Sequence, residues 1–573
     1  MKASDHIADF LHAQGVTHVF EVVGGMITHL IDSVHRRGKV KLVSVHHEQA
    51  AAFAAEAMGR STGVPGVAMA TSGPGAVNLL TGIGSCYFDS APAVFITGQV
   101  NLHEQKGRRA IRQLGFQETD IASMAEPITK AVFRVRSARS LPGVLEKAFR
   151  VALSGRPGPV LIDIPMDLQR EPVAAPGGRR MRPDAPAPVK AAAVEEVLSA
   201  LERAERPLIL VGGGVRSSRA LEGARRWLES VGAPVVNSLM AVDALPAGHP
   251  LRVGLIGSYG NRWANHALGR CDVLVVVGSR LDVRQTGADT KSFSEGRRIF
   301  HVDCEPGEIN NRIKGCRAVH AELGAFFETA TAGCRKRRFP NYASWHREIA
   351  SSRREWPDTS EPGRISGINP NSLMHALSRR SRGAGTYITD VGQHQMWAAQ
   401  SLDLSAGQRF MTSGGMGAMG FGLPAAIGAA FADPGRPQVL IAGDGGVQLN
   451  IQELQTVVRN RLPLKMVVLN NGCHGMVRQF QQSYFHERYA STFWGYSAPD
   501  FAAVAKAYGL ESACVARPAQ IEKGLAALWR QPKKPFLLEV LIDRATNVYP
   551  KIAFGRPLTE MEPLAKPIAM EWT

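Results

Sequence analysis

The residue types best suited to chemistry lie close together in the last third of the chain. Asp444 stands in a Gly-Asp-Gly-Gly turn, and Asn471 closes an Asn-Asn pair. The apolar runs 438–442 and 465–469 predict two buried strands, and the helical spacing of 451–461 predicts a helix between them. Parallel strands joined in this way bring their carboxyl ends together, so we expect Asp444 and Asn471 to lie side by side where such sheets bind ligands.

These two side chains together would suit a hard divalent cation. Carboxylate and carboxamide oxygens bind Mg²⁺ or Ca²⁺, and the cation keeps positions open for water and diphosphate oxygens. Gly443, Gly445 and Gly446 would let the backbone approach a diphosphate without a side-chain clash. A Gly-Asp-Gly segment alone is more often a simple tight turn. The Asn-Asn pair at the end of the second strand favours a metal–diphosphate site.

Length and composition indicate several α/β domains. A chain of 573 residues is too long for one core, and 58 glycines and 34 prolines are typical of a loop-rich α/β protein. No run of about 18 apolar residues offers a membrane span, and residues 1–15 lack the apolar core of a signal peptide. Seven cysteines without a CxxC pair argue against a zinc site or a disulfide framework. We therefore expect a cytoplasmic protein without a membrane partner.

The basic charge of the chain does not indicate a nucleic-acid partner. The formal net charge is +17, but the basic residues are scattered and 335–338 is the only dense run. A solvated linker face explains that run better than a nucleic-acid patch. The positive field would favour anionic ligands such as diphosphates and keto acids.

Short apolar runs alternate with helical patterns through most of the chain. This rhythm predicts α/β domains in which helices flank a parallel sheet. Polar and proline-rich stretches divide the chain into a domain 1–170, a linker 171–190, a domain 191–335, a linker 336–366 and a domain 367–573. Further strands are expected at 19–23, 42–45, 66–70, 94–97 and 160–164 in the first domain and at 208–211, 273–277 and 299–302 in the middle domain.

A Gly-Asp-Gly motif followed at this interval by Asn-Asn resembles the signature of thiamine-diphosphate enzymes. The resemblance implies that Mg²⁺ is bound by Asp444, Asn471 and the backbone carbonyl of Cys473. It also gives a role to Glu48, which stands between an expected strand and an expected helix at 49–60. Taken alone, a Glu there is usually a surface residue that complements the helix dipole. In the family, a Glu in this context hydrogen-bonds the aminopyrimidine ring of the cofactor and relays one proton.

Motifs spread over nearly the whole chain narrow this resemblance to acetolactate synthase. They are 71–78 (TSGPGAVN), 115–120 (GFQETD), 154–160 (SGRPGPV), 391–397 (VGQHQMW) and 414–422 (GGMGAMGFG). The likeness implies a pyrimidine-binding first domain, an FAD-binding-like middle domain and a diphosphate-binding third domain. It places Gly25, Phe116 and Gln117 with Glu48 in the catalytic set. The implied thiamine-diphosphate contacts are Gly73, Asn78, Gln393, His394, Gly417, Met419, Gly443, Asp444, Gly445, Gly446, Asn471, His474, Gly475 and Met476.

Three strand ends in the middle domain point to a second cofactor. A Gly-Gly-Gly turn at 212–214 is weak evidence by itself, because the full GxGxxG spacing is absent. The segment 278–284 and Asp303 also follow expected strands, and convergent strand ends favour a ligand site. These segments resemble the FAD site of acetolactate synthases, which implies contacts from Gly212, Gly213, Gly214, Gly278, Arg280, Asp282 and Asp303. Arg284 matches the arginine that faces the acceptor keto acid.

Two positions depart from the acetolactate synthase pattern. Met166 stands where these enzymes have Lys, and Phe480 stands where they have Trp. Neutral change is one explanation. The other is a different second substrate, because Met166 removes a cation from the mouth of the site and Phe480 alters its wall. The run 112–114 before Gly115 also resembles a subgroup that transfers acetyl units to ketones, including nucleotide-linked keto-sugars.

The resemblance predicts a carboligase that uses thiamine diphosphate, Mg²⁺ and FAD. Pyruvate would be the 2-keto acid donor, and a hydroxyethyl or acetyl unit would be added to a 2-keto acid or a ketone. The alternatives are a pyruvate-oxidase-like flavoenzyme, a simple 2-keto acid decarboxylase and a flavoprotein scaffold with an inactive thiamine site. A single cofactor must touch both the first and third domains, and in the family these belong to different subunits. We therefore expect a homodimer or homotetramer.

Overall fold

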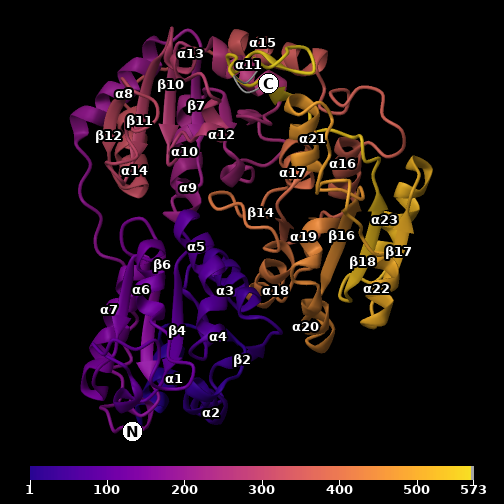
Figure 1. Cartoon of the computed structure of the whole chain (residues 1–573). Coiled ribbons are helices and arrows are strands. Elements are labelled where there is room, and N and C mark those ends of the chain that lie inside the picture. The colour runs from indigo at the N-terminus through magenta and orange to yellow at the C-terminus, as the bar shows by residue number, and fades with distance from the viewer. Residues whose placement is uncertain (569–573) are drawn as a thin grey trace.

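Three parallel sheets of six strands each, flanked by helices, form the chain in the computed structural model, which describes residues 1–568 (Figure 1). Their strand pairings are parallel, and a short antiparallel pair, β19 (Lys551–Ile552) with β20 (Met561–Glu562), lies near the C-terminal end. The predicted fold class is therefore confirmed. Within these residues, no helix is both long and apolar enough to cross a membrane.

The first sheet belongs to the N-terminal part of the chain. Its strands in spatial order are β2 (Lys41–Ser44), β1 (His18–Glu21), β3 (Gly66–Ala70), β4 (Ala93–Gln99), β6 (Pro159–Pro165) and β5 (Ala131–Arg134). Its helices are α1 (Ala3–Ala13), α2 (Thr28–Arg37), α3 (Glu48–Thr62), α4 (Pro74–Asn78), α5 (Leu80–Phe88), α6 (Ile121–Ala125) and α7 (Leu141–Leu153). The four inner strands are almost wholly buried, as expected of a sheet covered on both faces.

The second sheet lies in the middle of the chain. Its spatial order is β12 (Arg317–His320), β11 (Arg298–Asp303), β10 (Val273–Val277), β7 (Pro207–Val211), β8 (Val235–Asn237) and β9 (Arg252–Leu255). The helices around it are α8 (Ala191–Arg203), α9 (Gly214–Ser217), α10 (Leu221–Val231), α11 (Arg262–Arg270), α12 (Val283–Thr286), α13 (Thr290–Ser294), α14 (Leu323–Cys334) and α15 (Ala343–Glu355).

The third sheet carries the Gly-Asp-Gly-Gly turn. Its spatial order is β14 (Arg409–Met411), β13 (Thr386–Thr389), β15 (Gln438–Gly443), β16 (Leu464–Asn470), β18 (Phe536–Leu541) and β17 (Glu511–Val515). Its helices are α16 (Pro370–Arg380), α17 (Gln393–Ser401), α18 (Gly422–Ala432), α19 (Asp444–Gln448), α20 (Leu454–Arg459), α21 (Gly475–Tyr484), α22 (Phe501–Ala507) and α23 (Ile521–Trp529).

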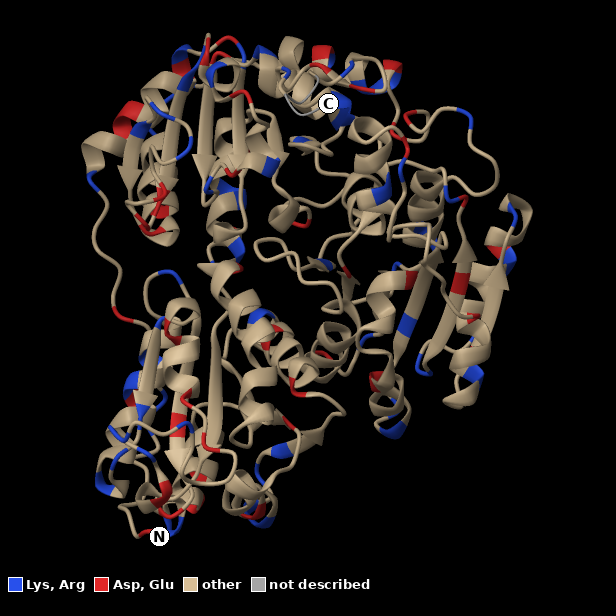
Figure 2. Cartoon of the chain, in the orientation of Figure 1, with Lys and Arg blue, Asp and Glu red and all other residues tan. Residues whose placement is uncertain are grey.

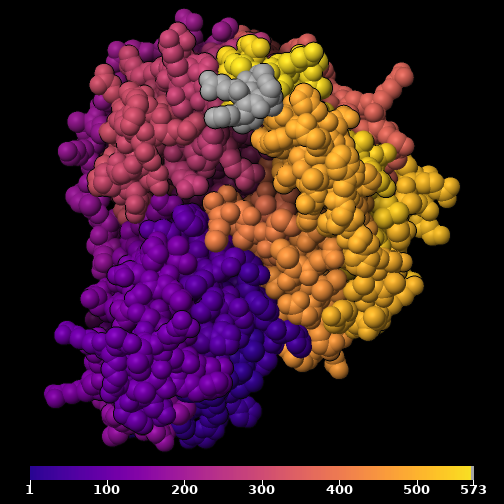
Figure 3. Space-filling view, in the orientation of Figure 1, coloured from indigo at the N-terminus to yellow at the C-terminus, as the bar shows by residue number. Residues whose placement is uncertain are grey.

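An alanine-rich helix joins the first and third parts of the chain. α3 packs along α18, and hydrophobic residues of both helices share one buried cluster. A Cβ atom on Gly428 would lie only 2.1 Å from the backbone oxygen of Ala54, so the two helices can approach this closely because Gly428 has no side chain. The two parts are in direct contact in the space-filling view (Figure 3).

The two expected linkers are docked against the domains. Gln14 Oε1 accepts from the backbone N–H of Met181 at 2.6 Å, which ties the first linker to α1. In the second linker, Glu361 forms a buried two-bond ion pair with Arg262, at 2.7 and 2.8 Å. Asp358 Oδ2 lies 2.9 Å from Nε2 of His375 on α16. The second linker therefore connects the middle and third parts of the chain through charged contacts.

The expected secondary structure differs from the observed one at several ends. β1 stops at Glu21, and Val23, which was expected in that strand, is 66% exposed. The expected helix 451–461 is a 3₁₀ turn, Ile451–Glu453, followed by α20.

Lys and Arg residues are spread over all three sheets and mixed with Asp and Glu (Figure 2). The net charge is therefore distributed rather than gathered on one element.

Candidate functional site

The third sheet brings Asp444 and Asn471 to one edge. β15 and β16 are neighbours with parallel register, and Gly443 pairs with Leu469. Asp444 begins α19 immediately after β15, and Asn471 follows the last residue of β16. The expected adjacency follows from these strand ends.

Three oxygen atoms converge at this edge. Asn471 Nδ2 donates to Gln393 Oε1 at 3.1 Å, so its Oδ1 points the other way. The Asn471 side-chain atom that faces away from Gln393 lies 3.2 Å from Asp444 Oδ1 and 2.8 Å from the Cys473 carbonyl oxygen. An amide nitrogen there would donate to both oxygens. With Oδ1 there, the spacing fits neighbouring ligands of one Mg²⁺, which are about 3 Å apart for bonds of about 2.1 Å.

The Asp444 carboxylate is buried without a cationic side chain. Its Oδ2 accepts a hydrogen bond from Tyr496 Oη at 2.8 Å. Burial raises the pKa of Asp444, although the Tyr496 hydrogen bond opposes that rise. None of the ion pairs within residues 1–568 involves Asp444. A bound cation would therefore stabilise the ionised form of this carboxylate.

Among residues 1–568, no group of three or more His, Cys, Asp or Glu side chains is placed to hold a metal ion. The oxygens around Asp444 are of a different kind, since they come from one carboxylate, one carboxamide and one backbone carbonyl. Such a set leaves several coordination positions for diphosphate oxygens and water, as Mg²⁺ sites usually do. The chemistry of the donors thus fits a metal–diphosphate complex.

The glycines of the turn are also required by their neighbours. A Cβ atom on Gly443 would lie 2.9 Å from His394 Nδ1, and one on Gly446 would lie 2.6 Å from Asp390 Oδ1. Gly445 faces His474 in the same way, at 2.8 Å. The backbone can therefore pack directly against these side chains because the turn has no side chains of its own.

His394 supplies an unused polar atom beside the turn. It lies in the first turn of α17, and its Nε2 is buried without a hydrogen-bond partner. Burial lowers the pKa of His394 to about 4, so the ring is neutral at physiological pH. A buried polar atom without a partner is costly, and in the tautomer with the proton on Nε2 the ring would donate to a diphosphate oxygen.

Other expected contacts of the cofactor surround the same strand ends. A Cβ atom on Gly475 would lie 2.0 Å from Gln393 Oε1, so α21 begins in direct contact with α17. Met476 is half-buried on α21. Gly417 has a φ of 67° and no atom near its Cβ position, and Met419 is half-buried in the same loop. Gly417 and Met419 lie on the loop between β14 and α18.

Glu48 lies in a separate group in the first domain. It is the first residue of α3, is buried, and accepts a hydrogen bond from Asn78 Nδ2 at 2.9 Å. Gly73 packs against Gln117, whose own φ of 66° costs about 1–3 kcal/mol in a non-glycine residue. Phe116 beside it is 80% exposed. Among residues 1–568, no hydrogen bond or ion pair links Glu48 to the Asp444 group.

Gly25 lies at the start of a short 3₁₀ turn, Gly25–Ile27, after β1. The space around its Cβ position is open to 4 Å. Gly24 just before it is tightly packed, because a Cβ there would lie 2.5 Å from Thr71. The chain therefore presents Gly25 as bare backbone at the carboxyl end of β1.

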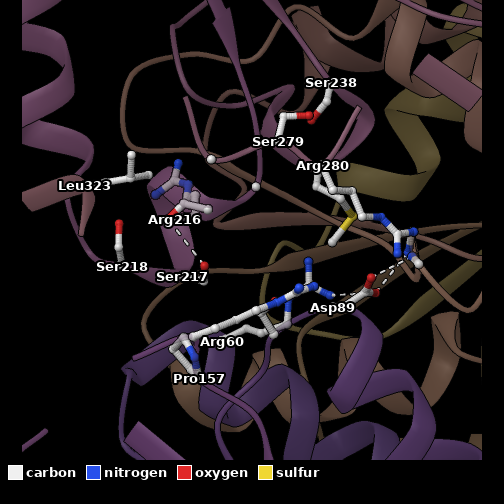
Figure 4. Close-up of a pocket in the computed structure, with 18 of the residues that line it drawn as sticks. Arg60, Asp89, Pro157, Arg216, Ser217, Ser218, Ser238, Ser279, Arg280 and Leu323 are labelled. Carbon is white, nitrogen blue, oxygen red and sulfur yellow. Dashed lines mark hydrogen bonds and ion pairs between the residues drawn. The ribbon is translucent and has the colours of Figure 1, made fainter. Parts of the chain in front are cut away.

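A large cavity of about 660 Å³ lies between the first and middle parts of the chain (Figure 4). Arg60 and Asp89 of the first domain face Ser279 and Arg280 of the middle domain across it. Most of the expected FAD residues line it, namely Gly213, Gly214, Gly278, Arg280, Asp282 and Asp303. This volume is within the range of ligand and cofactor pockets, about 300–1,000 Å³.

Gly212 is the expected FAD residue that does not line the cavity. A Cβ atom there would lie 2.1 Å from the backbone oxygen of Gly278. Gly214 also packs on Gly278 and donates its N–H to that oxygen at 2.9 Å. Gly212 thus holds two strand ends together, which leaves Gly213 and Gly214 beside the cavity.

The charged groups of the cavity are set by local structure. Asp282 caps α12 by accepting from the N–H groups of Arg284 and Gln285, at 2.9 and 3.2 Å. Arg280 Nε pairs with Asp282 Oδ2 at 3.3 Å. Burial raises the pKa of Asp303, which lies at the end of β11. The cavity also includes residues that the sequence did not suggest, among them Pro183, Asp184 and Pro186 of the first linker.

The three expected substrate residues lie on different elements. Arg284 is exposed on α12 and lines the cavity. Met166 follows β6, and its N–H donates to the backbone oxygen of Gln99 at 3.0 Å. Phe480 of α21 is 40% exposed, and its ring lies 4.6 Å from the ring of Tyr484. Of these three residues, only Arg284 lines the large cavity.

Two residues near the turn were missed from the sequence. Asp390 is fully buried after β13 and accepts from the N–H groups of Gly420 and Gly422, at 3.0 and 2.8 Å. Its place after a strand end was a usable signal, because β13 is a neighbour of β15. Tyr496 gave no such signal, since it lies in an irregular segment 52 residues beyond Asp444.

Three segments of the chain match thiamine pyrophosphate enzyme families. Residues 1–124 match the N-terminal TPP binding domain, residues 194–329 the central domain, and residues 390–540 the C-terminal TPP binding domain. These segments contain Glu48 at the start of α3, the strand ends beside the cavity, and the pair Asp444 and Asn471. The matches assign thiamine diphosphate as the cofactor of this fold.

Full-length relatives narrow the family. The chain is 39% identical to an acetolactate synthase large subunit of Parasynechococcus marenigrum, over 97% of this chain and 90% of the relative. It is 38% identical to the acetolactate synthase isozyme 2 large subunit of Escherichia coli, over 98% and 99%. Acetolactate synthase 2 of Zea mays is 35% identical, over 98% and 88%. The chain therefore belongs to the acetolactate synthase family of thiamine pyrophosphate enzymes.

Proposed function

We propose that this chain is a thiamine-diphosphate-dependent carboligase that decarboxylates pyruvate and adds the remaining two-carbon unit to a second carbonyl compound. The observation that carries the proposal is the convergence of oxygens from Asp444, Asn471 and Cys473 beside the unpaired Nε2 of His394. In an acetolactate synthase relative, this arrangement is best explained as the diphosphate end of the cofactor site. An oxidase, a simple decarboxylase and an inactive scaffold are less favoured.

Different residues of the site would bind the cofactor and transfer a proton. Thiamine diphosphate, when bound, supplies the electron sink that allows a 2-keto acid to lose CO₂. Asp444, Asn471 and the Cys473 carbonyl would hold Mg²⁺ against the diphosphate, and His394, with its proton on Nε2, would donate to one diphosphate oxygen. Glu48, oriented by Asn78, would exchange a proton with the aminopyrimidine ring.

We also propose that the large cavity binds FAD. Bare glycine backbone at Gly213, Gly214 and Gly278 allows close approach by a diphosphate. Arg280 offers a guanidinium group that suits phosphate oxygens. The proposal assigns no redox role to the flavin, because the carboligation itself transfers no electrons to a flavin.

The acceptor is proposed to be a 2-keto acid or a ketone. Arg284 would bind a carboxylate of a keto acid through its guanidinium fork. Met166 and Phe480 replace a cation and a larger aromatic ring of the family pattern. These replacements support a choice of acceptor that relies less on charge and more on apolar contact.

Self-association is part of the proposal. One cofactor must reach both Glu48 and Asp444, yet each belongs to its own hydrogen-bonded group within the chain. Large apolar side chains are exposed near both groups, including Val23, Phe116, Met416 and Leu449. Exposed apolar surface of this kind is typical of obligate interfaces. A second copy of the chain would cover it and complete the site, giving a homodimer or homotetramer.

Product analysis tests the function. The protein is incubated with pyruvate, thiamine diphosphate, Mg²⁺ and FAD, alone and with a panel of 2-keto acids and ketones, and products are identified by mass. We expect CO₂ together with a product that contains a new C–C bond. Hydrogen peroxide or reduced flavin would instead indicate an oxidase, and free acetaldehyde alone a decarboxylase. Failure to bind thiamine diphosphate would indicate an inactive scaffold.

A further inference from the structure

A buried carboxylate of the first domain holds the loop that carries Met419. Asp89 directly follows α5, and its side chain is 2% exposed. Its Oδ2 accepts from the N–H of Gly414 at 2.9 Å, and its Oδ1 accepts from the N–H of Gly415 at 2.6 Å. The two oxygens thus accept hydrogen bonds from two consecutive backbone N–H groups of the third domain, in the same chain.

Arg60 strengthens this attachment from α3. Its Nη1 donates to the carbonyl oxygen of Thr412 at 2.9 Å and lies 3.9 Å from Asp89 Oδ2. The same nitrogen pairs with Glu56 at 3.1 Å. The first domain therefore contacts the segment 412–415 through one cation and one anion, both of them largely buried. Such charge-assisted hydrogen bonds are stronger than neutral ones.

The other end of the loop is held by Asp390. Its oxygens accept from Gly420 and Gly422, as described above. Gly417 and Met419 lie between the two attachment points and are expected to contact thiamine diphosphate. The backbone of 414–422 is therefore fixed by two buried carboxylates, of which Asp89 comes from another domain.

The first residues of the loop also form part of the wall of the large cavity. Asp89, Gly414 and Gly415 line the cavity together with Met240 of the middle domain. A Cβ atom on Gly414 would lie 2.3 Å from Met240 Sδ, so the loop packs directly against that side chain. In the close-up, Asp89 lies on the same side of the cavity as Arg60, with Arg280 above it (Figure 4).

Charge extends this connection across the cavity. Burial raises the pKa of Asp89, and Arg60, the two glycine N–H groups and Arg280 oppose that rise. Arg280 is one of the residues proposed to bind FAD. A ligand that occupies the cavity would thus lie beside Arg280, whose charge acts on Asp89, and beside Met240, which packs against the loop.

We propose that Asp89 is a positioning residue that couples occupancy of the large cavity to the binding of thiamine diphosphate, through the 414–422 loop of its own chain. The inference rests on the proposed function, because it takes FAD and thiamine diphosphate as the two ligands. Binding at one site then favours the loop geometry that the other requires, and the coupling is reciprocal. The domain that is proposed to supply Glu48 to a partner's cofactor thereby also shapes the cofactor site of its own chain.

The test compares dissociation constants. The affinity of thiamine diphosphate, with excess Mg²⁺, is measured by calorimetry in the presence and in the absence of FAD. In the unaltered protein we expect FAD to tighten this binding by at least about fivefold, within the usual range of coupling between sites. Asp89→Asn keeps the size of the side chain but leaves one glycine N–H facing an amide NH₂. We expect the coupling factor to fall to near one in this variant.

A matched control and a second variant complete the test. Glu308→Gln changes another carboxylate of the same cavity, which pairs with Arg156 at 2.9 Å and does not bond the loop, and it should keep the coupling. Met240→Ala removes the packing against Gly414 and should weaken the coupling, so it serves if Asp89→Asn does not fold.

Three outcomes would count against the inference. Coupling that persists in Asp89→Asn or, if that variant does not fold, in Met240→Ala would overturn it and leave the proposed function intact. Tight binding of both ligands without coupling in the unaltered protein would do the same. If the unaltered protein bound no FAD, the flavin part of the proposed function would fail, and the inference with it.

Discussion

Glu48→Gln is expected to lower kcat by about 10³-fold, in the middle of the range for loss of a positioned proton-transfer group. The substitution keeps the shape of the side chain and an oxygen that can accept from Asn78 Nδ2. It removes only the ability to exchange a proton with the cofactor. Thiamine diphosphate and Mg²⁺ should therefore still bind, with the defect confined to turnover.

Steady-state kinetics and a binding titration on the same preparation check this expectation. Glu522→Gln is the matched control, because Glu522 is also an acidic residue in the first turn of a helix but lies exposed against Arg380. It should leave kcat unchanged. If Glu48→Gln also kept full turnover, Glu48 would only complement the dipole of α3, and the assignment of the cofactor site would fail.

Asp444→Ala is expected to abolish binding of thiamine diphosphate, with affinity reduced by more than about 100-fold. The diphosphate and the protein share one cation, so loss of the carboxylate removes a ligand of that cation. Changes to groups that only orient a metal ligand already cost about 10–100-fold. Calorimetric titration with Mg²⁺ present measures the effect directly.

Tyr496→Phe provides the graded comparison for Asp444. It removes the hydrogen bond to Oδ2 and leaves Oδ1 near the Asn471 side chain. We expect a loss of about tenfold, since the phenol orients the carboxylate without contacting the metal. Retained affinity in Asp444→Ala would mean that the Gly-Asp-Gly-Gly segment is only a turn.

Most of the inner strands could be predicted from the sequence, whereas β2 is the only edge strand that was expected, at 42–45. β3, β4, β6, β10, β15 and β16 each contain a run of apolar residues and are buried along most of their length, as expected when helices cover both faces of a sheet. β5 and β17 lie at sheet edges, and most of their residues are only partly buried. Their residues alternate too weakly to stand out. β8 has three residues, which is too short for any periodic signal.

Some residues of the site could likewise be predicted from the sequence, and others could not. Asp444 and Asn471 were predictable because their placement follows from two adjacent strand ends, which is a local rule. Asp89 and Tyr496 act through contacts between segments far apart in the chain, 325 residues in the case of Asp89 and Gly414. No spacing in the sequence encodes such a contact. It depends on how α5, the middle domain and the glycine loop pack in three dimensions.

The measurement that tests the account most directly is subunit complementation between Glu48→Gln and Asp444→Ala. Each variant alone should be inactive. They are mixed in equal amounts, dissociated and reassociated, and heterodimers are verified by differential tags. In each heterodimer, one site would pair the intact Glu48 of one chain with the intact Asp444 of the other.

We expect recovery of about a quarter of the unaltered activity, since random pairing makes about half of the dimers mixed and restores one of their two sites. No recovery in proven heterodimers would contradict it. Each site would then be built within one chain, and the exposed Phe116 and Val23 would need another explanation.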